Sequence, residues 1–454
     1  MNESRSSFSG KLGFVLAAAG ASVGLGNIWR FPYLAAQYGG GIFLLIYIIL
    51  ALTFGYTMIM AETAIGRMTK KSPVGAFARF TDNKLARAGG WINAIIPVLI
   101  VPYYSTIGGW VVKYLAEYLK GNVAPLAQAD YFEAFITEGY EAEVWFILFA
   151  AMVLMVILLG VENGIERVSK IMMPLLLVLA IVIVAYSVSL PGALEGVKYF
   201  LIPNPKNFSW MTVVTAMGQM FYSLSIAMGI LITFGSYMKD DVSIENATEN
   251  VEIFDTGIAI LAGLMIIPAV FAFSGGDSEA INGGPSLMFK TIPQVLASIG
   301  FPRIGGILFF ILVLFAALTS AIALLESAVS SLVDELKCSR RTGAIIIGIS
   351  TLLLGSLSSL GFGPLSGIQI LHMSFLDFAD FMTNSVMMPI AALAICFLVT
   401  RYIGVDAIAE EVEKDGHSFK RKGIFVFMIR YICPVFLVII LLSSIANAFG
   451  IIKM

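Results

Sequence analysis

The stretch Ser22–Pro32, "SVGLGNIWRFP", interrupts an apolar run with two glycines, an asparagine, an arginine and a proline. Gly24 and Gly26 fall near the centre of the run, where a membrane helix is normally continuous. A single glycine in such a helix usually serves close packing against a neighbour. Glycines combined with the polar residues Asn27 and Arg30 are harder to explain by packing, and they indicate that the helix unwinds here.

A second apolar run, residues 217–237, shows a similar interruption. It reads "MGQMFYSLSIAMGILITFGSY", with small residues near the middle of a stretch long enough to cross a membrane. Two matched, glycine-interrupted spans in the two halves of a chain are typical of transporters built from inverted repeats. Such transporters bind their substrate near the bilayer midplane, so we expect a site at the two breaks.

The composition is that of a protein embedded in a membrane. Of 454 residues, 58% are apolar and 13% are charged, and the mean hydropathy is +0.90. A net charge of -2 offers no basic surface for nucleic acid. Three scattered cysteines, and two histidines without neighbouring ligand types, predict neither a disulfide framework nor a metal or histidine-based catalytic site.

Counting about 20 apolar residues to a span gives about eleven helices and the fold class of an all-α integral membrane protein. The expected spans are 11–37, 41–66, 88–118, 143–160, 168–190, 211–236, 254–274, 303–333, 343–358, 370–400 and 423–448. The stretch 275–300 is only moderately apolar and contains glycine and proline. We expect it to be a loop with short helical pieces that lies over the protein as a lid.

Positive charges predict the orientation. Lysine and arginine gather in the second, fourth, eighth and tenth loops, whereas the third loop is acidic. Cytoplasmic loops are enriched in positive charge. We therefore expect a protein of the cell membrane with its N-terminus on the cytoplasmic side and, with an odd number of spans, its C-terminus on the extracellular side.

Unwinding a membrane helix leaves backbone N–H and C=O groups without partners, which is costly unless a ligand binds them. A half-helix N-terminus suits an anion such as a carboxylate, while freed carbonyls and small hydroxyls suit a hard monovalent cation. Hydroxyls are available near both breaks and on the eighth span, in Ser22, Ser223, Ser225, Thr319 and Ser320. One break can therefore hold a zwitterion and a cation together.

Three segments carry a family resemblance: "AGASVGLGNIWRFPYLAAQYGGGIF" (19–43), "GQMFYSLSIAMG" (218–229) and "LTSAIALLESAVSSLVDEL" (318–336). They resemble the signature segments of the neurotransmitter:sodium symporter family, whose fold is typified by the bacterial leucine transporter. The similarity covers essentially the whole chain. It implies a 5+5 inverted repeat with discontinuous helices 1 and 6, divided into residues 1–190, 191–402 with the lid loop 275–300, and an additional helix in 403–454.

The resemblance implies two sodium sites. The first would be formed by the Ser22 carbonyl, the Asn27 side chain, the Ser223 hydroxyl, a residue of the seventh span and the substrate carboxylate. The second would be formed by the carbonyls of Gly20, Val23 and Ala316 and the hydroxyls of Thr319 and Ser320. Because the first ion is fully coordinated only when substrate is bound, ion and substrate binding are coupled.

The resemblance also implies the substrate pocket. The substrate carboxylate would meet the N–H groups around Leu25 and Gly26 and the Tyr104 hydroxyl. The pocket residues we expect are Ser22, Val23, Leu25, Gly26, Tyr104, Tyr222, Ser225, Met228, Ala323 and Leu324.

Two positions bear on specificity. Met228 stands where the family often has Phe, and Ser22 stands where it often has Ala. A flexible methionine can repack around different apolar guests, which favours several hydrophobic or aromatic amino acids. A monoamine-type site would need a carboxylate where this chain has Gly24, so amino acids, which bring their own carboxylate, fit better.

The seventh span must supply a counter-charge for the first sodium ion. Family members bind chloride there or replace it with an acidic side chain, since a buried cation needs a compensating charge. Asp255 is our candidate, either ligating sodium directly or standing beside its ligands, and chloride would then not be required. Asn250 is the alternative ligand, and Asp255 could instead mark only a cytoplasmic helix entry.

Gates are also implied. Arg30 and Asp380 match the family's outer ion pair, with Tyr104 and Tyr222 as an aromatic lid beneath them. Arg5 and Asp334, helped by Ser236 and Tyr237, match the inner latch, and Phe8 stands where the family often has Trp.

The fifth span contains Gly164 and Pro174, ten residues apart. Pro174 cannot donate to its helix, and Gly164 lowers the cost of unwinding the turns before it. We expect this stretch to unwind in the inward-facing phase and admit water to the second sodium site, although a rigid, merely kinked helix is the alternative.

These features together predict a sodium-coupled symporter of hydrophobic amino acids that works by alternating access. A channel would need a continuous polar path, and a membrane enzyme would need a nucleophile with a base or a metal, for which no residue set appears. A non-transporting amino-acid sensor would use the same binding site and lack only flux. An amino-acid transporter of other specificity on the same fold is the second alternative. The sequence does not specify an oligomeric state.

Overall fold

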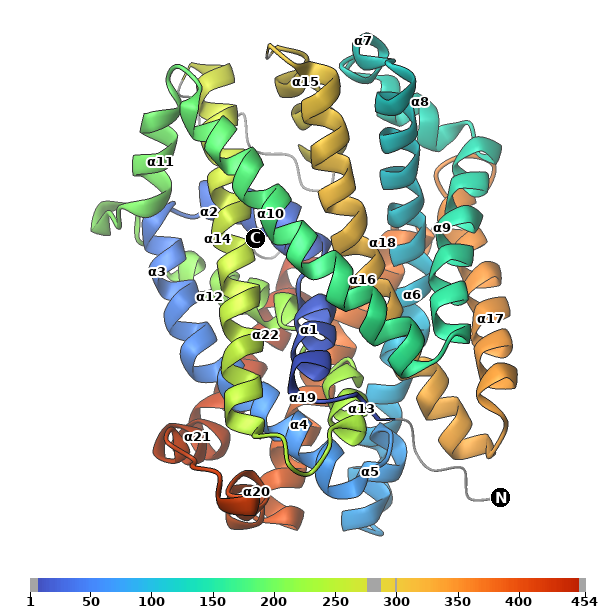
Figure 1. Cartoon of the computed structure of the whole chain (residues 1–454), viewed down its shortest axis with the longest axis vertical. Helices are drawn as coiled ribbons and strands as arrows, with labels where there is room; N and C mark the ends of the chain where they lie inside the picture. The colour runs from blue at the N-terminus through green and yellow to red at the C-terminus, as the bar shows by residue number, and fades with distance from the viewer. Residues whose placement is uncertain (1–6, 276–286, 299, 449–454) are drawn as a thin grey trace.

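A computed structural model describes residues 7–275, 287–298 and 300–448. The described chain is helical, with no strand beyond an isolated bridge between Ile370 and Met373. The long helices run roughly along the longest axis of the molecule, and α10 (Arg167–Ser189) crosses them obliquely (Figure 1). This confirms the all-α fold class.

Nine helices in the described ranges are long and apolar enough to cross a membrane. They are Gly41–Thr69 (α3, Gly41–Leu50, with α4, Tyr56–Thr69), Lys84–Lys120 (α6), Tyr140–Leu158 (α9), Val161–Ser189 (α10 and the turn before it), Ile244–Ser274 (α14), Pro302–Leu336 (α16), Arg340–Leu360 (α17), Phe375–Ile403 (α18, Phe375–Asp380, with α19, Met388–Phe397) and Lys422–Ala448 (α21, Lys422–Phe427, with α22, Cys433–Ala448).

The first span is broken where the sequence predicts. Helix α1 (Lys11–Ser22) ends at Val23, whose backbone is extended, and the chain resumes as a wide turn, Gly26–Arg30, followed by α2 (Phe31–Gln37). The two parts are bent by 53°. The break is packed tightly, because a Cβ atom on Gly24 would lie 2.7 Å from the Ser320 hydroxyl oxygen.

The predicted sixth span is also broken, into α12 (Trp210–Ser223) and α13 (Ile230–Tyr237). Ser225 and Ala227 in the connection have positive φ angles of 53° and 59°, a region that non-glycine residues rarely adopt. The Ala227 N–H donates to the Glu62 carboxylate at 2.8 Å. This buried carboxylate of α4 therefore supports the strained connection from another helix.

Several observed helices are longer than the predicted spans, and the seventh span differs most. Helix α14 begins at Ile244 rather than near residue 254, because the Ser243 hydroxyl caps its N-terminus by accepting the Asn246 N–H. Asp255 therefore lies inside the helix and is not at a helix entry. Helix α17 runs over Arg340–Leu360, a full span where the sequence predicts only 343–358.

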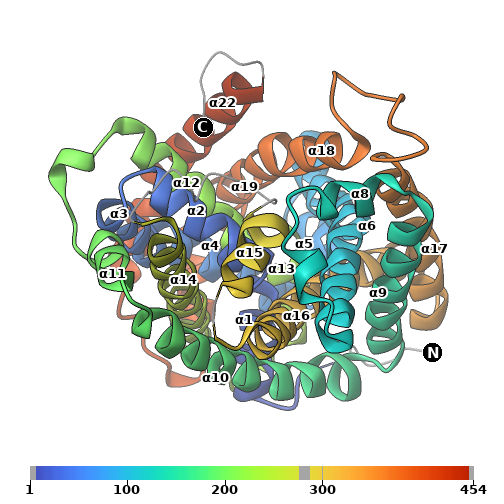
Figure 2. The same cartoon turned by 90° about the horizontal axis from the view of Figure 1, so that it is seen from above.

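Short helices cap both ends of the molecule. Figure 1 places α7 (Val123–Leu126), α8 (Tyr131–Thr137), α11 (Ala193–Leu201) and α15 (Ile292–Ala297) at one end, and α5 (Pro73–Phe80) and α20 (Val405–Val412) at the other. Seen from above, α15 lies over the middle of the molecule (Figure 2). It belongs to the predicted lid 275–300, of which residues 276–286 and 299 lie outside the described ranges.

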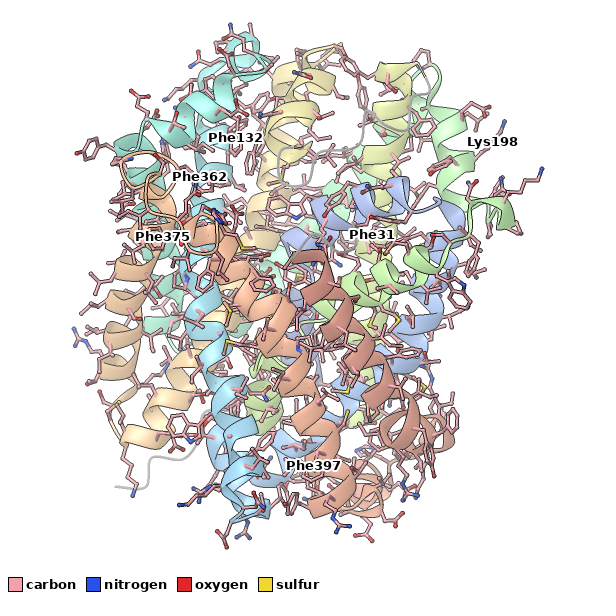
Figure 3. The ribbon with its side chains drawn as sticks, turned by 180° about the vertical axis from the view of Figure 1, so that it is seen from behind. Phe31, Phe132, Lys198, Phe362, Phe375 and Phe397 are labelled. Atoms are coloured by element: carbon pink, nitrogen blue, oxygen red, sulfur yellow. The ribbon has the colours of Figure 1, made fainter. Side chains whose placement is uncertain are left out.

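Apolar side chains cover the flanks as well as the interior (Figure 3). Phe31 is fully buried and packs edge-on against Phe43 and Tyr47, whereas Phe397 is 52% exposed. Lys198 projects outward near one end of the molecule and pairs with Glu195. A surface with large exposed apolar side chains along its flanks is suited to contact with lipid.

Candidate functional site

The two breaks meet at a small cavity of about 30 Å³. Eight of the ten predicted pocket residues line it: Ser22, Leu25, Gly26, Tyr104, Tyr222, Ser225, Met228 and Leu324. Val23 and Ala323 are buried but do not line it. The lining also contains Ala21, Gly24, Asn27, Ile100, Ser223 and Ser320. The structure therefore brings together residues from α1, α6, α12, α16 and the connection after α12.

Side chains satisfy several backbone groups at the first break. The Leu25 N–H donates to the Tyr104 hydroxyl at 3.3 Å, and the Gly24 N–H donates to the Asn27 side-chain oxygen at 3.0 Å. Gly26 must lack a side chain, since a Cβ atom there would lie 2.7 Å from the Tyr222 ring. The Leu25 N–H and the Tyr104 hydroxyl thus form a pair of polar groups at the cavity wall.

Asp255 lies at the centre of a buried polar cluster beside this cavity. Its carboxylate accepts hydrogen bonds from the Asn27 amide at 2.8 Å, the Ser223 hydroxyl at 3.0 Å and the Tyr47 hydroxyl at 3.1 Å. Asp255 is fully buried, and within the described ranges no Lys, Arg or His nitrogen lies within 4.0 Å of it. An unpaired buried carboxylate is costly, and its oxygen-rich surroundings are those that a hard cation prefers.

The structure does not bring Asn250 to this cluster. Its amide donates to the Asn246 carbonyl, one turn earlier in α14. Of the two candidates on the seventh span, only Asp255 contacts Asn27 and Ser223. Tyr47 is a member of the cluster that sequence reasoning missed, because a tyrosine within an apolar span carries no distinctive signal.

The second predicted sodium site also has its groups side by side. The Ser320 hydroxyl of α16 lies 3.3 Å from the Gly20 carbonyl, 3.1 Å from the Ala21 carbonyl and 3.3 Å from the Val23 carbonyl. The Thr319 hydroxyl donates to the Phe315 and Ala316 carbonyls of its own helix. The end of α1 therefore presents carbonyl oxygens toward the Ser320 hydroxyl of α16.

The predicted outer gate is not closed by a direct ion pair. The Arg30 guanidinium lies over the Tyr222 ring, 5.1 Å from its centroid, and the Asp380 carboxylate accepts from the Asn384 amide. No Arg30–Asp380 contact is found among the ion pairs of the described residues, which extend to 4.0 Å. Among the described residues Arg30 therefore contacts Tyr222, a residue of the cavity wall, instead of the Asp380 carboxylate.

At the predicted inner latch, hydrogen bonds and aromatic contacts hold neighbouring segments together. Arg5 of the predicted inner latch lies outside the described residues, and Asp334 accepts the Ser72 N–H at 2.8 Å. Phe8 packs edge-on against Phe14, Phe234 and Tyr237, and its N–H donates to the Tyr237 carbonyl.

A further ion pair lies close to this latch. The Arg340 guanidinium contacts both carboxylate oxygens of fully buried Glu326, at 2.7 and 2.5 Å, and the Tyr237 hydroxyl donates to the same carboxylate at 2.7 Å. Sequence analysis missed this cluster; it noted only that basic residues gather in the eighth loop, to which Arg340 belongs. An acid inside the apolar run "ALLESAV" is the signal that could have identified Glu326.

The start of the fifth span is helical in this structure. A wide turn, Val161–Glu166, precedes α10, and Pro174 lies inside α10. Gly164 fits where no side chain could, because a Cβ atom would lie 2.2 Å from the Val156 carbonyl oxygen. Glu166 accepts the Ser9 N–H at 2.8 Å, so this turn is bonded to the start of α1. Unwinding of the stretch remains a prediction.

Comparison with known proteins gives a consistent match. A sequence profile described as the Sodium:neurotransmitter symporter family matches residues 5–132 and 136–451. The uncharacterized sodium-dependent transporter YhdH of Bacillus subtilis is 32% identical over 442 residues, covering 96% of this chain and 97% of the relative. An uncharacterized sodium-dependent transporter of Methanocaldococcus jannaschii is 31% identical, covering 90% and 84%.

A solved structure is similar over nearly the whole fold. The crystal structure of MhsT in complex with L-phenylalanine superimposes with a TM-score of 0.87 at 36% sequence identity, covering 97% of this chain and 100% of that one.

Proposed function

The chain belongs to the sodium:neurotransmitter symporter family and is a sodium-coupled membrane transporter rather than an enzyme; on this premise we propose that it imports hydrophobic and aromatic L-amino acids by alternating access. The observation that carries the proposal is the position of the Leu25 N–H and the Tyr104 hydroxyl beside the Asn27–Ser223–Asp255 cluster. The first pair suits a carboxylate, and the cluster suits a monovalent cation.

In this proposal the substrate carboxylate replaces the Tyr104 hydroxyl as the acceptor of the Leu25 N–H. It accepts hydrogen bonds from the Leu25 and Gly26 N–H groups and from Tyr104, and its other oxygen ligates the first sodium ion together with Asn27 and Ser223. Sodium then has its full set of oxygen ligands only when substrate is present, which couples the two affinities.

We assign the counter-charge at this sodium site to Asp255. The ion would sit among groups that already converge on this carboxylate, namely Asn27 and Ser223. Since the protein then supplies the negative charge, transport should not require chloride. A second sodium ion would be held by the carbonyls of Gly20, Val23 and Ala316 with the hydroxyls of Thr319 and Ser320.

The preference for hydrophobic side chains rests on the walls of the cavity. Ile100, Met228 and Leu324 supply apolar surface, and Gly24 leaves no carboxylate to bind an amine. A cavity of about 30 Å³ must widen to admit an aromatic side chain, and Met228 is the wall residue best able to change its conformation. The similar protein MhsT has been crystallised with L-phenylalanine, which supports an aromatic substrate.

Alternating access would use the two ends of the molecule in turn. Arg30 and Asp380, with Tyr104 and Tyr222, would come together to close the outer side, and Arg5 with Asp334 would close the inner side. We propose that residues 1–190 and 191–402 form the two inverted repeats and that 403–454 adds the last helix. The N-terminus lies in the cytoplasm and the C-terminus outside the cell membrane, as the loop charges predict.

The test is uptake of radiolabelled tryptophan and leucine into proteoliposomes under an inward sodium gradient, with a potassium gradient as control. Asn27→Ala removes a ligand of the first sodium ion and should abolish sodium-dependent accumulation. Sodium-dependent binding without accumulation in the wild type would instead identify a non-transporting sensor. If neither amino acid binds, the substrate class inferred from Gly24 and Met228 is wrong.

A further inference from the structure

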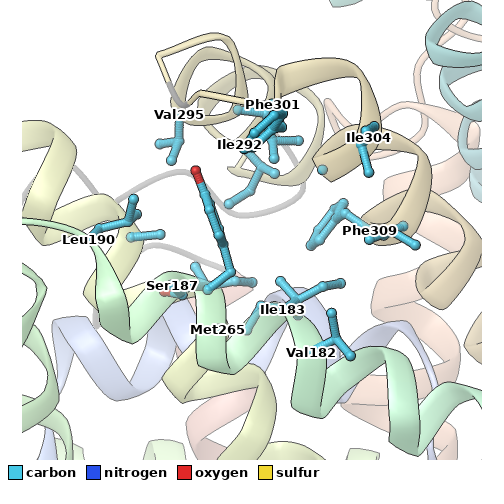
Figure 4. A pocket seen from close by; sticks show the side chains of 16 residues that line it. Val182, Ile183, Ser187, Leu190, Met265, Ile292, Val295, Phe301, Ile304 and Phe309 are labelled. Atoms are coloured by element: carbon cyan, nitrogen blue, oxygen red, sulfur yellow. The ribbon is translucent and has the colours of Figure 1, made fainter.

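A second cavity, of about 330 Å³, lies away from the transport site. It is a groove between α10, α14 and α16, closed at one end by α15 (Figure 4). Its walls include Val182, Ile183 and Ser187 of α10, Met265 of α14, Val295 of α15 and Phe309 of α16. Among the described residues, those that line it carry no charge. Its volume is at the lower end of the range for small-molecule pockets, about 300–1,000 Å³.

The groove opens on the flank of a membrane-spanning bundle. Val182 is 49% exposed and Ile304 is 57% exposed, and both belong to helices long and apolar enough to cross a membrane. In a transporter of this architecture the medium beside such a flank is the bilayer, whose acyl chains fill apolar grooves without any desolvation cost.

Polar groups at one end of the groove distinguish it from an ordinary lipid-facing surface. Ser187 is only 2% exposed, and its hydroxyl has no hydrogen-bond partner within the described part of the chain. A serine in a membrane helix usually donates to a carbonyl one turn earlier. Tyr186 also lines the groove, and tyrosine is enriched at membrane–water interfaces. Both residues lie close to the end of α10, at Ser189.

We propose that this groove binds one acyl chain of a membrane phospholipid, taken from the leaflet on the α15 side. The chain runs between α10, α14 and α16 along Ile183 and Val182. Its ester carbonyl, which lies at the interface, accepts the unused hydrogen bond of the Ser187 hydroxyl. With the orientation predicted from the loop charges, this is the outer leaflet. Because α15 forms one wall, the bound chain contacts the predicted lid segment as well as the spans.

The test uses full-length protein in nanodiscs of phosphatidylcholine, a fraction of which carries a photoreactive diazirine on one acyl chain. After irradiation, mass spectrometry compares labelling of the groove with labelling of the lipid-facing side of α17, around Ile349 and Leu353, which are 54% and 66% exposed. We expect about five-fold denser labelling in the groove, the ratio equivalent to one hydrogen bond of about 1 kcal/mol.

Two variants with matched controls make the test specific. Ser187→Ala should reduce groove labelling to the density on α17, while Ser443→Ala, at a serine already bonded to the Ile440 carbonyl, should leave it unchanged. Val182→Trp fills the groove from an exposed position that tolerates a larger side chain, and it should exclude the label, whereas Ile349→Trp on α17 should not.

Three results would overturn the proposal. Equal labelling of the groove and of α17 in the wild type would mean that only non-specific lipid contacts the groove. Groove labelling that persists in Val182→Trp would place the bound chain elsewhere. Labelling of the groove below the α17 density would show that phospholipid does not enter it.

Discussion

Replacing Asp255 by serine tests the proposed counter-charge. The carboxylate accepts hydrogen bonds from Asn27, Ser223 and Tyr47, and it is the negative charge that we assign to the first sodium ion. Losing one hydrogen-bonded interaction with a charged group costs about 1.5–3 kcal/mol. Because 1.4 kcal/mol corresponds to a factor of ten, the sodium concentration for half-maximal uptake should rise by about 10- to 150-fold.

Comparing uptake in chloride with uptake in gluconate distinguishes loss of the Asp255 charge from misfolding of the variant. Serine is shorter than aspartate and leaves space in which chloride can supply the missing negative charge. Uptake of radiolabelled leucine into proteoliposomes should therefore fall strongly in gluconate and recover in chloride for Asp255→Ser, while the wild type behaves alike in both salts.

Glu62→Gln is the matched control, because Glu62 is also fully buried but contacts the Ala227 N–H instead of Asn27. Its uptake defect should not respond to chloride. The reasoning is refuted if Asp255→Ser keeps the wild-type sodium dependence in gluconate, or if the wild type itself requires chloride.

Further predictions concern the break, the inner ion pair and the fifth span. Gly24→Ala places a Cβ atom 2.7 Å from the Ser320 hydroxyl oxygen and should abolish binding of labelled substrate without preventing membrane insertion; retained affinity would contradict this. Arg340→Ala leaves the Glu326 charge buried and unpaired, which should cost about 3–5 kcal/mol of stability in thermal unfolding, and adding Glu326→Gln should recover part of the loss; an unchanged melting temperature would count against the pair. Pro174→Ala should slow release of labelled sodium to the cytoplasmic side, and unaltered release kinetics would favour a rigid, kinked helix.

The broken helices could be predicted from sequence because their cause is local. Glycine, asparagine and proline within "SVGLGNIWRFP" disfavour a continuous helix wherever the segment sits. The structure adds the reason that the break is held open: Gly24 and Gly26 face Ser320 and Tyr222 with no space for a side chain.

The choice between Asp255 and Asn250 could not be made from sequence, because it depends on contacts between distant segments. Asp255 meets Asn27 across 228 positions of the chain, and the hydrophobic pattern does not fix where α14 begins. The Ser243 cap sets that start and places Asp255 inside the helix.

Buried acids were the main omission of the sequence analysis. Glu62 and Glu326 stand alone in apolar runs, and each is fully buried with a specific partner, the Ala227 N–H for the first and Arg340 for the second. An ionisable residue within a membrane span is costly and therefore marks a functional or structural contact. Applied to every span, this rule would have singled out both residues, though not their partners.

The central claim is that one helix break holds an amino acid and sodium together. Equilibrium binding of labelled leucine to the purified protein, measured across sodium concentrations, tests it most directly. We expect sodium to raise the affinity for leucine, leucine to raise the affinity for sodium by the same factor, and Asn27→Ala to remove both effects. Leucine binding that is independent of sodium, or coupling that survives in Asn27→Ala, would contradict the account.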